Sequence, residues 1–141
     1  FARLVSELAT SDVVEGGPVC DAMAEELTRY FNGEKVAFSS PLNLDNLTAF
    51  QRRVATATAE IPYGSVDTYG HLAQKAGSPL AFRAVGQVMA KNNLPIVIPC
   101  HRVMGHSGGL GGFACGLEWK VRLLELEGYE GLRPALKRKY G

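Results

Sequence analysis

The feature that most constrains the fold is a pair of short helical patterns separated by Gly77. Thr68 is a good N-cap for the first pattern, whose apolar positions are Tyr69, Leu72, Ala73 and Ala76. Ser78–Pro79 predicts an N-cap and a first helical residue for the second, whose apolar positions are Ala81, Val85, Val88 and Met89. Two short helices joined by a tight turn make this segment a candidate helix-turn-helix.

Arg83 lies near the start of the second helix. It is rotated by about 200° from Val85 and is therefore predicted to point away from the core. An outward arginine on a recognition helix can contact DNA. An ordinary αα-hairpin with a solvated arginine fits the same pattern. The residues alone favour that simpler interpretation, because helix-turn-helix geometry is common and has many uses.

Further helices are predicted on both sides of this pair. Pro18 is a plausible first residue of a helix that stops at Gly33. Another helix contains Phe50 and ends at the turn over residues 61–65, and a last one begins at Gly116. Their apolar faces comprise Val19, Met23, Leu27, Tyr30 and Phe31, then Phe50, Val54 and Ala57, and finally Leu117, Val121 and Leu124.

Two short strands complete the predicted fold. One lies at the start of residues 36–48, which then continue as a loop, and the other is the buried run 96–98 between two prolines. The expected fold class is therefore α/β, in the α+β sense. A small N-terminal α/β lobe and its linker would occupy residues 1–46, and a mostly helical domain residues 47–141. Because the chain starts at Phe1 rather than Met, we expect the lobe to be truncated.

Composition and charge limit the classes of protein that this chain can belong to. Of 141 residues, 46% are hydrophobic, enough for one compact core, and no apolar run is long enough to span a bilayer. Three cysteines without CxxC spacing predict free thiols in a reducing compartment, the cytoplasm or, in a eukaryote, the nucleus. Residues 1–49 carry three Lys/Arg against eight Asp/Glu, whereas the remainder carries twelve against six. A positive C-terminal portion is compatible with a polyanionic partner.

The stretch "PIVIPCHRV" places a thiol, an imidazole and a guanidinium side by side, from Cys100 to Arg102. A thiol reacts as its thiolate, so a reactive Cys100 needs a group that accepts its proton. Adjacent strand residues point to opposite faces, so contact with His101 would need a turn at Pro99 or a bridging water. A carboxylate that orients the imidazole would complete a relay, and either Glu125 or Glu127 could supply it.

Other interpretations of these residues stay open at this point. A lone cysteine after an apolar strand is more often a core residue than a nucleophile. Cys100, His101, His106 and Cys115 could in principle bind zinc, but their spacing lacks a short ligand pair, so no metal site is predicted. The glycine-rich run over residues 104–113 lacks the lysine and serine of a P-loop, so a mobile lid or a plain turn is favoured over a phosphate site.

Taken together, these segments resemble the O6-alkylguanine-DNA alkyltransferase family. "PIVIPCHRV" is similar to its active-site signature, and "IPYGSVDTYGHLAQKAGSPLAFRAVGQVMAKNN" is similar to its helix-turn-helix, including "RAVG". "GLEWKVRLLELEG" resembles its last conserved helix, and "LTRYFNGEKVAFSSPLNL" the passage between its two domains. The match covers roughly residues 27–128. It implies a helix-turn-helix of winged-helix-like form and a short active-site strand within the second domain.

The resemblance implies specific roles at matched positions. Cys100 would take the alkyl group irreversibly, His101 (through a water) and Glu127 would form the thiolate, and Tyr69 would protonate the departing guanine. The residues implied at the DNA are Arg83, which would fill the gap left by the flipped nucleotide, Ala84, Gly86 and Thr68. Those implied around the substrate are Asn92, Met89, Pro95, Val103 and Lys120. Arg102 fits a structural salt bridge better than a chemical role.

The sequence departs from the family pattern just before the last helix. Members often have a tyrosine, a small polar or basic residue and a glycine there, whereas this chain has Phe113–Ala114–Cys115–Gly116. The loss of a hydroxyl near the O6 pocket puts the substrate range in question. The N-terminal zinc ligands of some members have no counterpart, because Cys20 is the one cysteine in that region.

The resemblance thus predicts a DNA-repair methyltransferase that acts once per molecule and needs no cofactor. Its substrate would be O6-alkylguanine in double-stranded DNA, with O4-alkylthymine as a further candidate. We expect a monomer with no obligate protein partner and no membrane association. The alternatives are a non-catalytic alkyltransferase-like protein, in which the nucleophile is commonly replaced by tryptophan, and a helix-turn-helix regulator. Cys100 argues against the first, and the lack of a dimerisation element against the second.

Overall fold

The structure is a computed structural model that describes residues 17–141. Its contacts divide the chain into two compact units, residues 1–42 and residues 43–141. Residues 17–141 contain six α-helices, one short 3-10 helix and one two-stranded parallel sheet. The predicted mostly helical second domain is therefore confirmed. The predicted boundary between residues 46 and 47 stays a prediction, and the part of the lobe before Gly17 lies outside the described residues.

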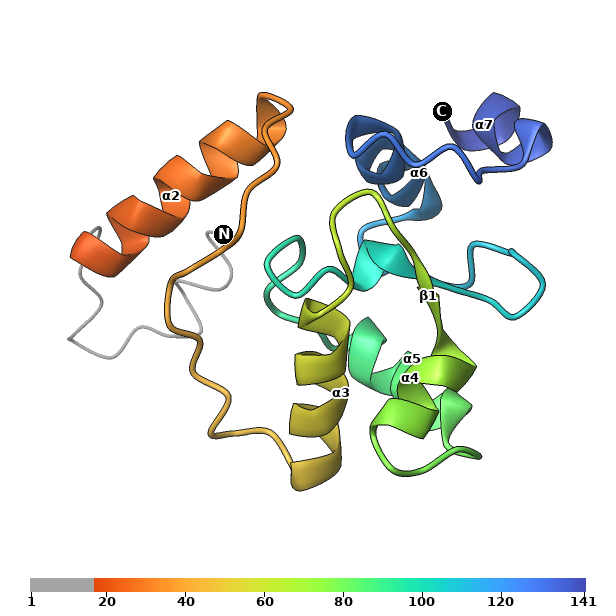
Figure 1. Cartoon of the computed structure of the whole chain (residues 1–141), viewed down its shortest axis with the longest axis horizontal. Coiled ribbons are helices and arrows are strands. Elements are labelled where there is room, and N and C mark those ends of the chain that lie inside the picture. Colours follow the sequence, from red (N-terminus) through yellow and green to blue (C-terminus); the bar gives the residue numbers. More distant parts are fainter. Residues whose placement is uncertain (1–16) are drawn as a thin grey trace. The chain divides into compact units, whose positions relative to one another are not determined.

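The described part of the first unit consists of one helix and an extended segment (Figure 1). Helix α2, Pro18–Phe31, begins at the predicted proline, and Gly33 follows its end with a φ of 87°. Glu26 on the helix accepts hydrogen bonds from Ser39 and Ser40. The predicted strand after Val36 is wrong, because the described residues of this unit contain no second strand with which it could pair.

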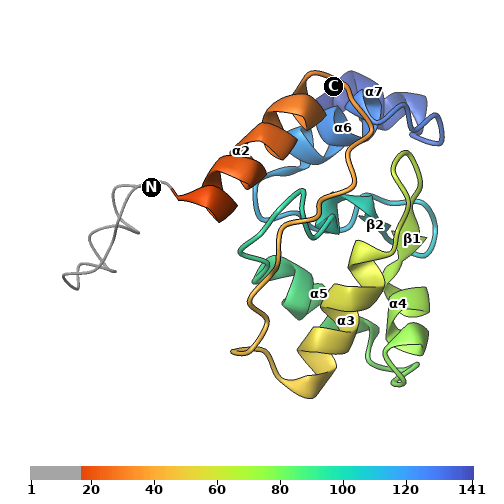
Figure 2. The same ribbon diagram turned by 60° about the vertical axis from the view of Figure 1, so that its left-hand side comes forward.

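Three helices form the lower part of the second unit (Figures 1 and 2). Helix α3, Ala49–Ala59, starts with a capping box between Thr48 and Gln51. Helix α4, Tyr69–Lys75, starts at the predicted N-cap, whose hydroxyl accepts a hydrogen bond from the backbone N–H of His71 at 3.1 Å. Helix α5, Phe82–Ala90, follows after a turn through Gly77, which has a φ of 76°.

The second helix of the pair starts later than predicted. Ser78–Pro79 does not cap it, because the Ser78 carbonyl accepts the backbone N–H of Ala81 at 2.9 Å and closes a β-turn. Pro79 then occupies the second position of that turn, which suits its fixed φ. Helix α5 begins only after this turn, at Phe82. The buried residues Val85 and Met89 nevertheless follow the predicted apolar spacing.

A small parallel sheet joins the helix pair to the segment after Cys100. Strand β1, Asp67–Thr68, pairs with strand β2, Val103–Met104, in the register Asp67–Val103 and Thr68–Met104. Figure 2 shows both strands beside the start of α4. The predicted strand over residues 96–98 is instead a turn closed by a bridge between Pro95 and Ile98, with Ile96 at a φ of 75°. Two flanking prolines favour such a turn, because a proline cannot donate to a sheet ladder.

Two apolar clusters support these elements. The larger one packs α3, α4 and α5 together and includes Leu72, Val85, Met89 and Cys100. The smaller one lies under α6, Leu117–Leu126, and α7, Pro134–Tyr140, and includes Met104, Val121, Leu124 and Leu132. Cys100 and Met104 lie on one short segment, so the chain around the thiol connects both clusters. None of the described helices is long and apolar enough to cross a membrane.

Candidate active site

Cys100 is the first residue of a short 3-10 helix, η1, Cys100–Arg102. Its side chain is buried in the larger core cluster, with 6% of the residue exposed. Asn92 donates one hydrogen bond to the Cys100 sulfur at 3.1 Å and another to the Ile98 carbonyl at 2.9 Å, while its own carbonyl accepts the N–H of Leu94. A single amide therefore fixes the turn before the thiol and contacts the thiol itself. The sequence did not indicate this direct contact.

Burial raises the pKa of the Cys100 thiol above its usual value. The hydrogen bond from Asn92 and the positive charge of Lys120 act in the opposite direction but do not overcome burial. The thiol consequently holds its proton near neutral pH. A reaction through the thiolate needs a base that removes this proton as the reaction proceeds.

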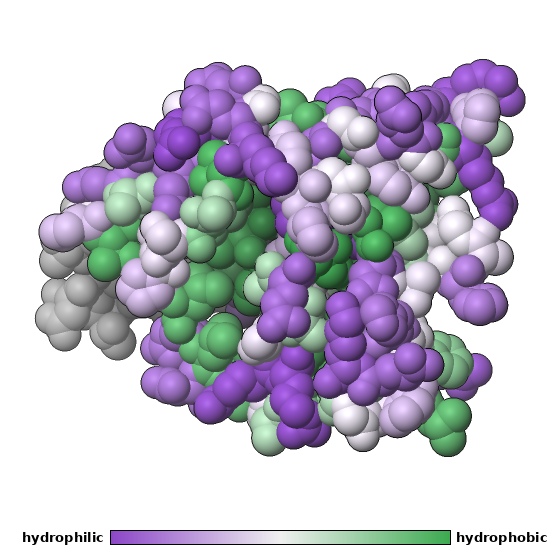
Figure 3. All heavy atoms as spheres, in the orientation of Figure 1, coloured by the Kyte–Doolittle hydropathy of each residue, from purple (hydrophilic) through white to green (hydrophobic). Residues whose placement is uncertain are grey.

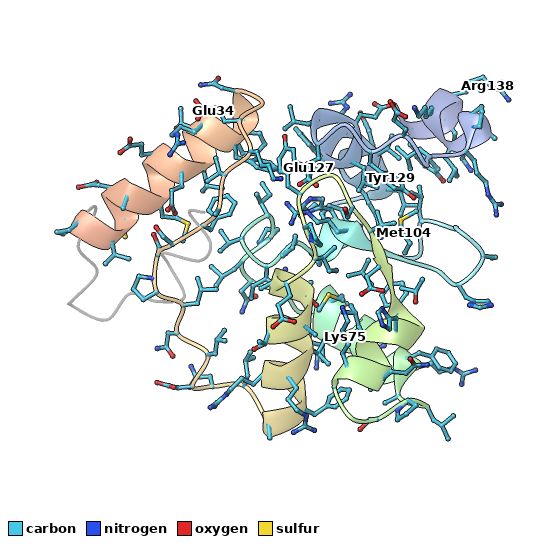
Figure 4. The ribbon with its side chains drawn as sticks, viewed as in Figure 1. Glu34, Lys75, Met104, Glu127, Tyr129 and Arg138 are labelled. Atoms are coloured by element: carbon cyan, nitrogen blue, oxygen red, sulfur yellow. The ribbon has the colours of Figure 1, made fainter. Side chains whose placement is uncertain are left out.

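His101 and Glu127 form the buried pair that the resemblance implies. The imidazole Nε2 lies 2.7 Å from the Glu127 carboxylate, and both side chains are fully buried. Glu127 is the C-cap of α6 and lies beside the loop that precedes β1 (Figure 4). Burial lowers the pKa of His101 more strongly than Glu127 raises it, so the imidazole is neutral at neutral pH and able to accept a proton. The competing candidate, Glu125, is exposed.

Arg102 holds the same carboxylate from the other side. Its guanidinium donates two hydrogen bonds to Glu127, each 2.9 Å long, and a third to the Ile61 carbonyl at 2.6 Å. The backbone N–H of Gly64 also donates to Glu127, at 3.2 Å. The bidentate geometry fixes the orientation of the Glu127 carboxylate. The structural salt bridge expected of Arg102 is therefore present in the fold.

The 3-10 geometry explains why the side chains of Cys100 and His101 point in different directions and contact different residues. In such a helix, successive side chains are rotated by about 120°, because it has three residues per turn. Cys100 and His101 were expected to lie on a strand and so to point to opposite faces, but residues 100–102 are helical. The two side chains nevertheless point to different partners, because the Cys100 sulfur contacts Asn92 and the His101 ring contacts Glu127.

Lys120 is a fully buried ammonium on α6. It donates hydrogen bonds to three backbone carbonyls, those of Val103 at 2.5 Å, Leu110, and Gly112 at 3.4 Å. Burial lowers its pKa from 10.5 to about 8. Leu110 and Gly112 belong to the glycine-rich loop, so Lys120 fixes this loop next to Cys100. The sequence placed Lys120 on the correct helix but did not indicate that it anchors the loop.

The Cys100 pocket is a cavity of about 420 Å³ with the thiol at one wall. Its lining comprises Tyr69, Phe82, Gly86, Met89, Ala90, Cys100, Gly112, Phe113 and Ala114. Tyr69 donates its hydroxyl to the Gly112 carbonyl at 3.3 Å, and burial raises the pKa of this phenol. The volume suits a small flat molecule such as a nucleobase.

Val103 and Pro95, which were predicted around the substrate, do not line the Cys100 pocket. Val103 is fully buried and offers its carbonyl to Lys120, and Pro95 belongs to the turn closed at Ile98. Met89, by contrast, lines the pocket. Phe82, Ala90 and Gly112 do line it and were not predicted. The sequence does not indicate the position of Phe82 at the pocket, because no pattern in the residues around it on α5 singles it out.

The residues predicted at the DNA lie around the start of α4 and on α5. Arg83 and Ala84 are exposed, and Gly86 is half-buried at the pocket. The Thr68 hydroxyl caps the N-terminus of α4 by accepting a hydrogen bond from the backbone N–H of His71. Beside these helices, the surface over α3 and α4 is mainly hydrophilic (Figure 3), and Arg52, Arg53 and Lys75 line a shallow hollow there.

A buried thiol at a nucleobase-sized pocket, next in sequence to a buried histidine–carboxylate pair, is the arrangement expected of a nucleophile in a group-transfer protein. Comparison with known proteins identifies the class. Residues 49–129 match the family model described as 6-O-methylguanine DNA methyltransferase, DNA binding domain. The methylated-DNA–protein-cysteine methyltransferase of Methanopyrus kandleri is 46% identical over 114 residues, which cover 81% of this chain and 85% of that protein.

Solved structures agree with this result. Mycobacterium tuberculosis OGT in complex with DNA superimposes with a TM-score of 0.73 at 41% identity, over 82% of this chain and 71% of that one. S. pombe Atl1, in complex with damaged DNA containing O6-carboxymethylguanine, gives 0.52 at 35% identity, over 62% and 80%. The chain belongs to the methylated-DNA–protein-cysteine methyltransferase family, which repairs DNA by transferring an alkyl group to a cysteine.

Proposed function

We propose that Cys100 is the residue that receives the alkyl group from O6-alkylguanine in double-stranded DNA, in one irreversible transfer per molecule. O4-alkylthymine is a further candidate substrate. The observation that carries the proposal is the position of the Cys100 sulfur, at the wall of the pocket and in contact with Asn92. In the transfer, the sulfur forms a bond to the alkyl carbon, the bond from that carbon to O6 breaks, and the guanine leaves.

The thiol proton would pass to His101 through a bridging water. Glu127 holds Nε2 of the imidazole, so Nδ1 is the nitrogen that would take the proton. The resulting imidazolium would be stabilised by the Glu127 carboxylate, which Arg102 and Gly64 keep in place. This relay supplies the base that the raised pKa of the thiol requires.

Tyr69 would deliver a proton to the departing guanine. Its raised pKa means that the hydroxyl keeps its proton at neutral pH. The hydroxyl now donates to Gly112, at the edge of the Cys100 pocket, and would turn from this carbonyl to a ring nitrogen of the bound base. Protonation neutralises the charge that develops on guanine as its bond to the alkyl group breaks.

The α4–α5 pair would act as the helix-turn-helix that holds the duplex. Guanine O6 lies inside the base pair, so the nucleotide has to leave the stack before a thiol can reach it. Arg83 is exposed on α5 and would occupy the vacated space, while the small residues Ala84 and Gly86 allow close approach of the backbone. Thr68 would act indirectly, by capping α4. We further propose a monomer that acts in the cytoplasm, or in the nucleus of a eukaryote, without an obligate protein partner.

The remaining proposals concern domain organisation. Residues 47–141 would form the catalytic DNA-binding domain, in a winged-helix-like arrangement. Residues 1–46 would belong to a smaller lobe and its linker. The contact boundary after residue 42 lies close to this division.

The decisive experiment is mass spectrometry of the protein after reaction with duplex DNA that contains O6-methylguanine. We expect one methyl group, located on the peptide that contains Cys100, and none on the exposed Cys20 or Cys115. Cys100→Ser should abolish the transfer, and Cys115→Ser, the matched control, should retain it. Binding of the damaged duplex without transfer would instead support the non-catalytic alternative.

A further inference from the structure

We infer that Phe82 is a substrate-binding residue, whose ring forms the outer wall of the Cys100 pocket and packs against the flipped purine nucleoside. The inference rests on the proposed function of this pocket and gives a role to a residue that neither the resemblance nor the relay assigned one. Phe82 is the first residue of α5 and remains 48% exposed. It nevertheless lines the same cavity as Cys100.

The position of Phe82 follows from the periodicity of α5. The pocket-lining residues of this helix are Phe82, Gly86, Met89 and Ala90, which recur at helical spacing and therefore form one stripe. Met89 is buried at the inner end of the stripe, and Phe82 lies about 10 Å away along the axis, at the outer end. Between them Gly86 has no side chain. The stripe thus consists of an inner wall, a gap and an aromatic outer wall.

The segment around Phe113 contributes a second part of the pocket lining. Gly112, Phe113 and Ala114 line the pocket there, and Lys120 anchors the glycine-rich loop through the Leu110 and Gly112 carbonyls. A flat base entering between α5 and the loop has an aromatic side chain available on each. Such apolar walls bind the faces of a purine by stacking and dispersion, irrespective of which alkyl group O6 carries.

Phe82 and the adjacent Arg83 differ in one respect, because only Phe82 lines the Cys100 pocket. The Arg83 guanidinium lies 5.9 Å from the Phe82 ring centre, so the two side chains are neighbours at the start of α5. Arg83 does not line the pocket, and its proposed contact is with the duplex. Leu80, only two residues before Phe82, is 91% exposed and does not line the pocket either. Phe82 is therefore the large apolar residue of this segment that a base in the pocket would contact.

The test compares a free base with a duplex. Phe82→Ala should slow the reaction with free O6-benzylguanine by about 5- to 20-fold, the lower part of the range for loss of one base–aromatic stacking contact. The reaction with O6-methylguanine duplex should slow in parallel. Phe82→Tyr should restore the rate to within about twofold, and Leu80→Ala, the matched control, should change it by no more than that. The reaction of Cys100 with iodoacetamide should be unaffected by all three substitutions.

Three results would overturn the inference. A loss confined to the duplex would mean that the ring contacts DNA outside the pocket, and an equal loss with iodoacetamide would mean that Phe82 only supports the fold around the thiol. Equilibrium binding of O6-benzylguanine to Cys100→Ser, with and without Phe82→Ala, tests the contact between the Phe82 ring and the base in the absence of transfer. Weaker binding to the double variant supports this contact, and unchanged binding contradicts it. Absence of transfer in the unsubstituted protein would refute the proposed function instead.

Discussion

The two sides of the thiol are built in opposite ways. On one side, His101, Arg102 and Glu127 are buried, and their polar groups are joined by short hydrogen bonds. On the other side, Phe82 and Arg83 are exposed, and the contact between them is a loose ring contact. The network that we propose as the proton relay is thus fixed by the fold itself, whereas the proposed DNA-facing side would obtain its contacts from the ligand. Substitutions on the first side should cost stability, and those on the second should cost substrate recognition.

The strongest test of the buried side is Glu127→Ala. It would leave the Arg102 guanidinium buried without its carboxylate, so the free energy of unfolding should fall by about 3–5 kcal/mol. Urea denaturation measures the change. Glu125→Ala, two residues away and exposed, should change the free energy by no more than about 0.5 kcal/mol. A loss below about 1 kcal/mol for Glu127→Ala would show that the network is not held as tightly as its geometry indicates.

A second test uses the buried ammonium of Lys120. Its pKa falls from 10.5 to about 8 on folding, so between these values the unfolded state binds more protons than the folded state. This group should therefore make the protein more stable as pH rises from about 8 to 10, by up to about 1.4 kcal/mol per pH unit. Comparing denaturation of the unsubstituted protein and Lys120→Met across this range isolates the contribution. Parallel pH profiles would contradict the lowered pKa.

Asn92→Ala tests the hydrogen bond to the Cys100 sulfur, which lies between the two sides. Loss of the hydrogen bond to the sulfur removes a contact that lowers the pKa of the Cys100 thiol, so this pKa should rise further. A hydrogen bond to a charged group contributes about 1.5–3 kcal/mol, so alkyl transfer near neutral pH should slow by about tenfold or more. The pH dependence of Cys100 alkylation by iodoacetamide reports the pKa directly. Asn93→Ala, at the exposed neighbouring position, is the control and should leave both quantities unchanged.

The mildest test concerns the exposed side. Arg83→Ala should slow repair of the duplex by about tenfold, because its proposed contact is made only when a nucleotide has left the stack. The reaction with free O6-benzylguanine and the free energy of unfolding should hardly change, since Arg83 is exposed and lies outside the pocket lining. Equal losses with both substrates would contradict a role in base flipping and would remove the contrast between the two sides.

Local patterns predicted the helices better than the connections. The N-cap at Thr68 and the proline at the start of α2 act on neighbouring backbone groups, so the sequence predicted both. The prediction for Ser78–Pro79 was wrong because the same residue types start a helix or form a turn, and the prediction for residues 96–98 was wrong because a turn replaces the strand there. Tertiary contacts decided between them.

The candidate site shows the same division. The resemblance supplied Cys100, His101 and Glu127, and their spacing in the sequence could not have selected Glu127 over Glu125. Burial of one and exposure of the other separates them in the folded protein. The direct contact of Asn92 with sulfur and the place of Phe82 at the pocket depend on distances between segments, which no periodicity reports.

The distribution of the relay along the chain also has a consequence for when the thiol becomes reactive. Glu127 binds His101, Arg102 and Gly64, so the relay joins segments up to 63 residues apart. Synthesis proceeds at about 5–20 residues per second, and contacts of such separation form only when the later segment is present. While the ribosome is still making residues 102–126, Cys100 and His101 have been synthesised, but the carboxylate that would orient the imidazole has not. The proposed relay is thus incomplete until the chain has grown past Glu127 and has folded.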